Sequence, residues 1–180
     1  MPWRFFPLLC VLLCTPFSCL AGERYPVSLL GGLVSLEVPE GLSPLAADLR
    51  RAKFPDLPFD AGDVLASQDG SATVAVCRSE MPFPDDMATA RPVLSMELHE
   101  LYPDALWVRD DLVMVDGRFC ARFSLETVAP DGPLRHDVLV FGHEGRMLVV
   151  SVSAGGPSRG RWMGHSEEIL QSLRVRAVAR

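Results

Sequence analysis

The sequence predicts an α+β fold in which helices pack on the faces of a single twisted antiparallel β-sheet. Short apolar runs joined by glycine-containing turns indicate β-hairpins, and the last four runs follow one another as a meander. Segments with apolar residues at helical spacing separate these runs and follow them. Because each such helix must bury an apolar stripe, we expect the helices to cover the sheet.

Two hairpins and a short helix are predicted in the first half of the chain. The paired strands are Val27–Leu30 with Leu33–Val38, and Asp63–Gln68 with Ser71–Arg78. Their turns, Gly31-Gly32 and Asp69-Gly70, contain residues that tolerate positive φ. Between the hairpins, Ser43 as an N-cap and Pro44 as the first helical residue predict a helix that ends near Lys53.

A second helix is predicted from about Thr89 to Tyr102, after a proline-containing loop over Ser79–Asp86. Pro92 fits only in the first turn of such a helix. Leu94, Leu98 and Leu101 recur at helical spacing and form its expected buried stripe.

The second half of the chain is predicted to be the meander and a closing helix. The four strands are Leu106–Val115, Arg118–Thr127, Leu134–Gly142 and Arg146–Ser153. By their period of two, Phe119, Ala121, Phe123 and Leu125 share one face of the sheet. The closing helix covers about Ser158–Leu173, and its inward residues are Trp162, Ile169, Leu170 and Leu173.

Residues 1–21 are predicted to be a secretory signal peptide, and residues 22–180 a single domain. Arg4 is the sole charge of this leader, an apolar stretch follows from Phe5 to Leu13, and Cys19-Leu20-Ala21 offers small residues for cleavage before residue 22. Removing the leader takes away one arginine and no acidic residue, which changes the formal net charge from −6 to −7.

Two alternatives to a cleaved signal remain. The apolar stretch is shorter than the ~20 residues that cross a bilayer, so a transmembrane anchor is disfavoured and we expect no transmembrane helix in the mature chain. A lipoprotein acylated at Cys19 is the other alternative, although Pro16 stands where an aliphatic residue is preferred. The acidic balance argues against nucleic acid as a partner, since that binding needs lysine and arginine.

Several short segments, in this order, resemble the PsbP/DcrB-like family of small exported bacterial proteins, which has the Mog/PsbP-like fold. They are Ser35–Gly41, Lys53-Phe54-Pro55, Asp69–Val76, Glu100–Pro103, Val115–Arg118 and Trp162–Leu173. The resemblance spans about Leu33–Val175 and implies an α/β/α sandwich. It also implies a binding, assembly or chaperone module, and it supplies no catalytic residue because the family shares no catalytic motif.

The mature chain contains two cysteines, Cys77 and Cys120. In an exported protein two cysteines favour one disulfide, provided that their strands are adjacent. The alternative is two buried free thiols. A zinc site is disfavoured because the CxxC spacing is absent.

No motif for catalysis, cofactor binding or metal binding is present, so we expect no catalytic residue, cofactor or metal. The four histidines, His99, His136, His143 and His165, are interpreted as structural or surface residues. The polar side of the closing helix, with Arg161, His165 and Glu168, is the expected partner surface.

Three classes of function are compatible with these observations. The first is an exported, non-enzymatic binding or assembly module whose partner is another envelope or secreted protein. The second is a periplasmic inhibitor or immunity-type protein, for which the acidic charge suits a basic target. The third is a hydrolase with a dispersed active site, which would need a pocket lined by carboxylates and a perturbed histidine.

Overall fold

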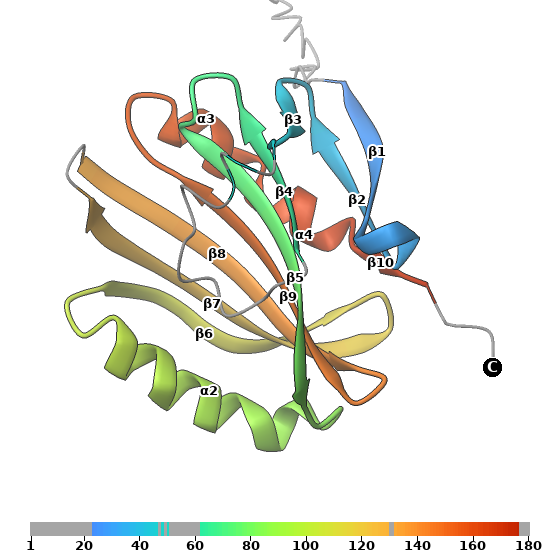
Figure 1. The fold of residues 1–180 in the computed structure, drawn as a ribbon. Helices are drawn as coiled ribbons and strands as arrows, with labels where there is room; N and C mark the ends of the chain where they lie inside the picture. Colours follow the sequence, from blue (N-terminus) through green and yellow to red (C-terminus); the bar gives the residue numbers. More distant parts are fainter. Residues whose placement is uncertain (1–22, 47, 49, 51–61, 130–131, 177–180) are drawn as a thin grey trace, which may run out of the picture.

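The structure, a computed structural model, describes residues 23–46, 48, 50, 62–129 and 132–176, so the predicted signal peptide lies outside the described residues. Two antiparallel β-sheets and three helices make up this part of the chain (Figure 1). The elements are β1 (Arg24–Leu29), the 3₁₀ turn η1 (Leu30–Gly32), β2 (Val34–Pro39), β3 (Leu42–Pro44), β4 (Gly62–Ser67), β5 (Ala72–Pro82), α2 (Met87–Leu101), β6 (Leu106–Val115), β7 (Arg118–Ala129), β8 (Gly132–His143), β9 (Arg146–Ala154), α3 (Arg159–Gly164), α4 (Ser166–Gln171) and β10 (Arg174–Val175).

The predicted α+β class and the antiparallel pairing are confirmed, but the prediction of a single sheet is wrong. The larger sheet has the strand order β3-β4-β5-β9-β8-β7-β6, and the smaller one has the order β1-β2-β10. The smaller sheet forms because the chain returns after α4 and places Arg174 opposite Ser35 of β2. A strand of two residues is too short to show a periodicity in the sequence.

Type I′ turns connect β6 to β7 and β8 to β9. Asp116 and Gly117 have φ of 51° and 71°, and Glu144 and Gly145 have φ of 54° and 71°. Two consecutive residues with positive φ match the right-handed twist of the strands they join. The second turn is one residue shorter than predicted, because His143 still pairs with β9.

The region around Pro44 differs from the prediction. Pro44 ends strand β3 and pairs with Leu65, so it does not begin a helix. Proline is tolerated there because β3 is the edge of the larger sheet, where a missing backbone N–H costs no ladder bond. Leu45 and Ala46 are not helical, Asp48 and Arg50 are helical, and residues 47, 49 and 51–53 of the predicted helix lie outside the described residues.

The main core lies between the two sheets and under α3 and α4. Its most deeply buried apolar side chains are Val34, Leu36, Val38, Leu139, Phe141, Leu148, Val150, Ile169, Leu170 and Leu173. Trp162 is also buried, so the predicted inward side of the closing helix is confirmed. Burial of one such aliphatic or aromatic side chain contributes about 1.5–3 kcal/mol to folding.

The closing helix is broken into α3 and α4 at His165. The backbone N–H of His165 donates to the carbonyl of Trp162, and Ser166 donates its hydroxyl to the carbonyl of Met163 and to Asp137. Gly164, which lowers helix propensity, directly precedes the break. The break turns α4 so that it packs against both β2 and β9.

Helix α2 covers the opposite face of the larger sheet, along β6 and β7 (Figure 1). It begins at Met87, two residues earlier than predicted, because Asp86 caps it by accepting a hydrogen bond from the N–H of Ala88. Pro92 therefore lies in the second turn. The expected stripe is only half-buried, and Leu101 is 66% exposed. Within the described ranges, none of the helices is long and apolar enough to span a membrane.

The expected Cys77–Cys120 disulfide is absent, and both thiols are free and buried. The condition for that disulfide, that the two strands are adjacent, is not met, because β9 and β8 lie between β5 and β7. Following the register from Cys77 through Val149 and Val140 leads to Ala121, so Cys120 points to the other face. Burial raises the pKa of each thiol to about 11.

Candidate functional site

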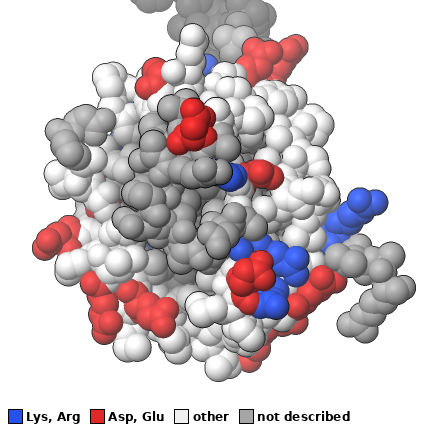
Figure 2. All heavy atoms as spheres, in the orientation of Figure 1, with Lys and Arg blue, Asp and Glu red and all other residues white. Residues whose placement is uncertain are grey.

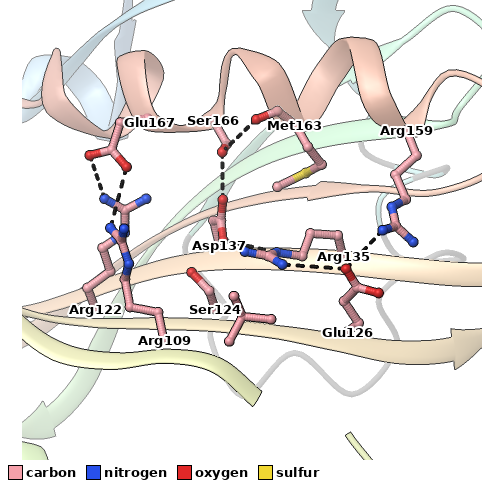
Figure 3. Close-up of a pocket in the computed structure, with 11 residues that line it drawn as sticks. Arg109, Arg122, Ser124, Glu126, Arg135, Asp137, Arg159, Met163, Ser166 and Glu167 are labelled. Carbon is pink, nitrogen blue, oxygen red and sulfur yellow. Dashed lines mark hydrogen bonds and ion pairs between the residues drawn. The ribbon is translucent and has the colours of Figure 1, made fainter. Parts of the chain in front are cut away.

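A charged pocket of about 440 Å³ lies between the larger sheet and the α3–α4 segment (Figure 3). Strands β6, β7 and β8 form its floor, and both short helices form its other wall. Four arginines line it, namely Arg109, Arg122, Arg135 and Arg159. Three carboxylates stand among them, Glu126, Asp137 and Glu167.

The alternation of strand β7 places its polar residues in the pocket. Arg122, Ser124 and Glu126 occupy every second position and therefore share one face. On β8, Asp137 pairs with Ser124 and Arg135 pairs with Glu126, so a polar ladder runs along the floor. The alternate residues of β7 face α2 and form an apolar surface. The polar and the apolar side chains of this strand therefore lie on opposite faces of the sheet.

Arg122 is the most deeply buried charge of the pocket, with 3% of its side chain exposed. Its Nη1 lies 2.7 Å from Oε1 of Glu167, and Nη1 of Arg109 lies 3.4 Å from Oε2 of the same carboxylate. Figure 3 shows Glu167 pointing from α4 toward both guanidinium groups. The hydrogen bond from Arg122 lowers the pKa of Glu167, so this carboxylate stays anionic and keeps the buried arginine paired.

A second group of ion pairs occupies the other end of the pocket. Glu126 accepts from Nη2 of Arg159 at 2.9 Å and lies 3.4 Å from Nη1 of Arg135. Asp137 lies 3.3 Å from Nε of Arg135 and accepts the hydroxyl of Ser166 at 2.5 Å. Each carboxylate of the pocket is thus bound by at least one arginine.

This arrangement suits binding better than acid–base chemistry. Ser166 hydrogen-bonds directly to Asp137, and the residues that line the pocket include no histidine to relay a proton between them. An anionic Glu167 held by arginine is a poor proton donor. The described residues also contain no group of three histidine, cysteine or acidic side chains that could hold a metal ion.

The predicted surface of Arg161, His165 and Glu168 does not reach this pocket. Arg161 is exposed and its guanidinium lies 5.1 Å from the centre of the Trp162 ring. Glu168 lies 3.5 Å from Nδ1 of His165 and forms a 3.1 Å ion pair with Arg24 of β1. Glu168 therefore links α4 to the smaller sheet. Whether a partner contacts them stays a prediction.

Of the other histidines, His99 and His136 have structural partners. The ring of His99 stacks on Trp107 with 3.9 Å between centroids. His136 hydrogen-bonds to Ser153 at 2.9 Å and to Thr127 at 3.2 Å, and burial lowers its pKa.

The outer edge of β6 is a second candidate site. Among the described residues β6 pairs with β7 alone, so the backbone groups on its other side have no partner strand. The strand exposes four large apolar side chains, Leu106, Val108, Leu112 and Met114. The middle of the strand carries three charged residues, Arg109, Asp110 and Asp111. Charges on an edge strand disfavour uncontrolled edge-to-edge aggregation. The bulge at Val108 brings that residue and Arg109 into the wall of the charged pocket.

Charges elsewhere on the surface are of both signs. Figure 2 shows acidic side chains scattered over the face drawn in Figure 1, with most of the visible basic ones gathered at one side and acidic ones among them. Net charge therefore does not distinguish the two candidate sites from the rest of the surface. The charged pocket is distinguished by its paired arginines, and the β6 edge by its exposed apolar side chains.

Neither a family model nor a curated protein sequence matches the chain. Solved structures do match it. The Ran-binding protein Mog1p of Saccharomyces cerevisiae matches with a TM-score of 0.57 at 16% identity, covering 86% of this chain and 96% of that one. Cyanobacterial PsbP (CyanoP) of Synechocystis sp. PCC 6803 matches with a TM-score of 0.60 at 11% identity, covering 91% and 99%. The chain has the Mog1/PsbP-like fold. A Pseudomonas aeruginosa protein of unknown function, PA94, also matches, with a TM-score of 0.52 at 11% identity, over 87% and 100% of the two chains.

The Mog1/PsbP-like fold confirms the resemblance seen in the sequence. At these identities the similarity establishes the fold alone, because one fold supports many functions. The charged pocket is not predicted by the sequence. The alternation of polar and apolar residues over 120–126 was the one signal of the pocket in the sequence. A charged strand face is normally interpreted as solvent-exposed, and only the packing of α3 and α4 shows that this one is covered.

Proposed function

We propose that the protein is an exported, non-catalytic binding or assembly module, and that it recognises an extended segment of another envelope or secreted protein along the β6 edge. The observation that supports this most directly is the combination of unpaired backbone groups with exposed apolar side chains on β6. A partner strand that adds to such an edge gains main-chain hydrogen bonds, and its side chains contact those of β6.

The position of the charged pocket adds to this proposal. Since Val108 and Arg109 belong to both β6 and the pocket wall, side chains of an added strand that point to this face would meet the arginines. Asp110 fixes the strand to α2 on the opposite face of the sheet, because its carboxylate accepts hydrogen bonds from Arg91 and Ser95 at 2.5 Å each. The edge is therefore held in an extended form before a partner arrives, which reduces the entropy lost on binding.

The fold similarity supports a binding role by analogy. Mog1p is described as a Ran-binding protein, so a protein of this fold can act by binding another protein. The inhibitor or immunity-type alternative would use a surface of the same kind, and the identity of the partner separates the two roles. The hydrolase alternative needs a proton donor or a relay histidine that the charged pocket does not supply.

Export is the part of the proposal that rests on the sequence alone. We expect the mature protein to lie outside the cytoplasm and to begin at Gly22. Mass spectrometry of the protein isolated from cells that produce it would give this terminus directly. An intact Met1 would contradict export by cleavage, and a lipid on Cys19 would replace it with the lipoprotein alternative.

The chain offers matched residues for testing the β6 edge. Leu106 and Leu101 are 64% and 66% exposed, Val108 and Val93 are 53% and 52% exposed, and Met114 and Met96 are 59% and 57% exposed. The first residue of each pair lies on β6 and the second on α2. Two triple lysine variants therefore change the same residue types at the same exposure on different surfaces.

We expect the β6 triple variant to lose a partner that both the wild type and the α2 triple variant retain. The assay is affinity capture from an envelope extract with quantitative mass spectrometry, after thermal melts have shown that both variants are folded. The lysines place charge where the partner would bury apolar surface. Loss of the partner by the α2 variant alone would move the binding surface to the helix, and equal capture by all three proteins would contradict the proposal.

A further inference from the structure

One end of the larger sheet gathers three nitrogen-bearing side chains from three strands. Arg78 lies on β5, Arg118 begins β7 and His143 ends β8. Arg78 and Phe141 both pair with Leu148 of the intervening β9, so they point to the same face, and His143 follows two residues after Phe141. The guanidinium of Arg118 lies 5.6 Å from the centre of the Phe141 ring, and its Nη1 lies 3.4 Å from Nδ1 of His143. We call these three residues the Arg78–Arg118–His143 cluster.

Each member of the cluster has a buried nitrogen without a hydrogen-bond partner. These atoms are Nε of Arg78, Nε of Arg118 and Nε2 of His143. Only two further buried side-chain atoms in the described part of the chain lack a partner, Nε of Arg122 and Nδ1 of His165, and both belong to other sites. Because buried polar groups are nearly always paired, three unpaired nitrogens at one place indicate a missing partner.

All three unpaired atoms are hydrogen-bond donors. A guanidinium has no acceptor, so Nδ1 of His143 must accept the hydrogen bond from Arg118. The neutral imidazole then carries its proton on Nε2. Burial lowers the pKa of His143, and the charges of Arg118 and Arg78 lower it further while Glu144 and Asp85 oppose them, so the neutral form prevails at neutral pH. The missing partner is therefore an acceptor.

The positive charge of the cluster is incompletely balanced. The side chain of Arg78 forms no ion pair or hydrogen bond with any described residue. Arg118 has Asp116 at 3.5 Å, but that carboxylate also accepts the backbone N–H of Val175 at 2.9 Å. Glu144 and Asp85 act on His143 from a distance, but neither is paired directly with Arg78, and two guanidinium groups favour an anion as the acceptor that completes the site.

We infer that the Arg78–Arg118–His143 cluster binds an oxyanion of the phosphate class, either free phosphate or a phosphomonoester. A tetrahedral oxyanion supplies three or four acceptor oxygens, one for each of three donors from three strands, whereas a carboxylate has only two acceptor oxygens. Two guanidinium groups match the charge of such an ion. The Arg118 side chain is 27% exposed, so the cluster lies next to solvent, and its guanidinium groups must rotate to turn their buried Nε–H groups toward an ion that enters from there. The site is separate from the β6 edge, so this inference does not depend on the proposed function.

Titration of the full chain with inorganic phosphate at constant ionic strength tests the site. We expect saturable binding with a dissociation constant of about 1 mM or tighter, and a matching shift of the Nε–H and Nε2–H proton resonances of the cluster. Acetate at the same concentration should not saturate. A parallel titration with phenyl phosphate distinguishes the two sources, since binding of it identifies a phosphomonoester site and its exclusion identifies a site for the free ion. No saturation with either phosphate, or equal binding of acetate, would overturn the inference.

Arginine variants test whether phosphate binds at the Arg78–Arg118–His143 cluster. Arg78→Gln should weaken phosphate binding about tenfold or more, the loss expected for one charge-assisted hydrogen bond. Arg174→Gln, which changes an exposed arginine of β10, should leave it unchanged. Arg78→Lys retains the charge but lacks Nε–H, so it serves as a second, folded variant with intermediate affinity. Equal weakening by Arg78→Gln and Arg174→Gln would show that only the overall charge of the chain attracts phosphate.

Discussion

Replacing Trp162 with alanine is expected to reduce the free energy of unfolding by about 3–5 kcal/mol, the usual loss when a large buried aromatic side chain is removed. Trp162 is 5% exposed and belongs to the core under α3. Gly41 lies so close that a Cβ atom added there would be 3.5 Å from atom Cη2 of the indole ring. Gly41 has no side chain of its own that could move into the cavity. Denaturant melts of both proteins measure the difference.

The alternative for Trp162 is an exposed anchor for a partner, as tryptophans often are at interfaces. Its burial argues against this role. Arg161→Ala is the control, because it removes the exposed guanidinium above the ring and should cost no more than about 1 kcal/mol. An unchanged melting temperature for Trp162→Ala, together with loss of a captured partner, would contradict burial as the main role of this residue.

A loss of similar size, about 3–5 kcal/mol, is expected for Phe123→Ala, whereas Phe119→Ala should change stability by less than about 0.5 kcal/mol. The two phenylalanines lie on the same face of β7, but Phe123 is 0% exposed and Phe119 is 59% exposed. The ring of Phe123 meets Trp107 edge to face at 6.5 Å beneath α2, which contributes to the difference. Chemical denaturation of both variants tests the pair, and equal losses would contradict the packing of α2 on this face.

Local signals explain why the hairpins could be predicted from the sequence. Asp116-Gly117 and Asp69-Gly70 specify their turns through residues that tolerate positive φ, and the apolar alternation of the flanking strands depends on near neighbours alone. The apolar spacing of the closing helix likewise identified its buried residues, with Trp162 and Leu173 among them.

Long-range pairing explains what could not be predicted. The order of strands in the larger sheet inserts β9 and β8 between β5 and β7, and no local pattern encodes that insertion. The expected disulfide failed for this reason. The break at His165 depends on Ser166 meeting Asp137 from a strand 29 residues earlier, and the charged pocket depends on the same contact. Both features arise only when distant segments meet.

The separation of Cys77 and Cys120 has a consequence for how this chain matures. The two sulfur atoms project from opposite faces of the larger sheet, so no redox step at these positions is needed to reach the native fold. With the pKa of each thiol at about 11, almost no thiolate forms at neutral pH, and exchange of the native protein with disulfides of other molecules is slow. The native protein therefore has the same two free, buried thiols in a reducing and in an oxidising compartment.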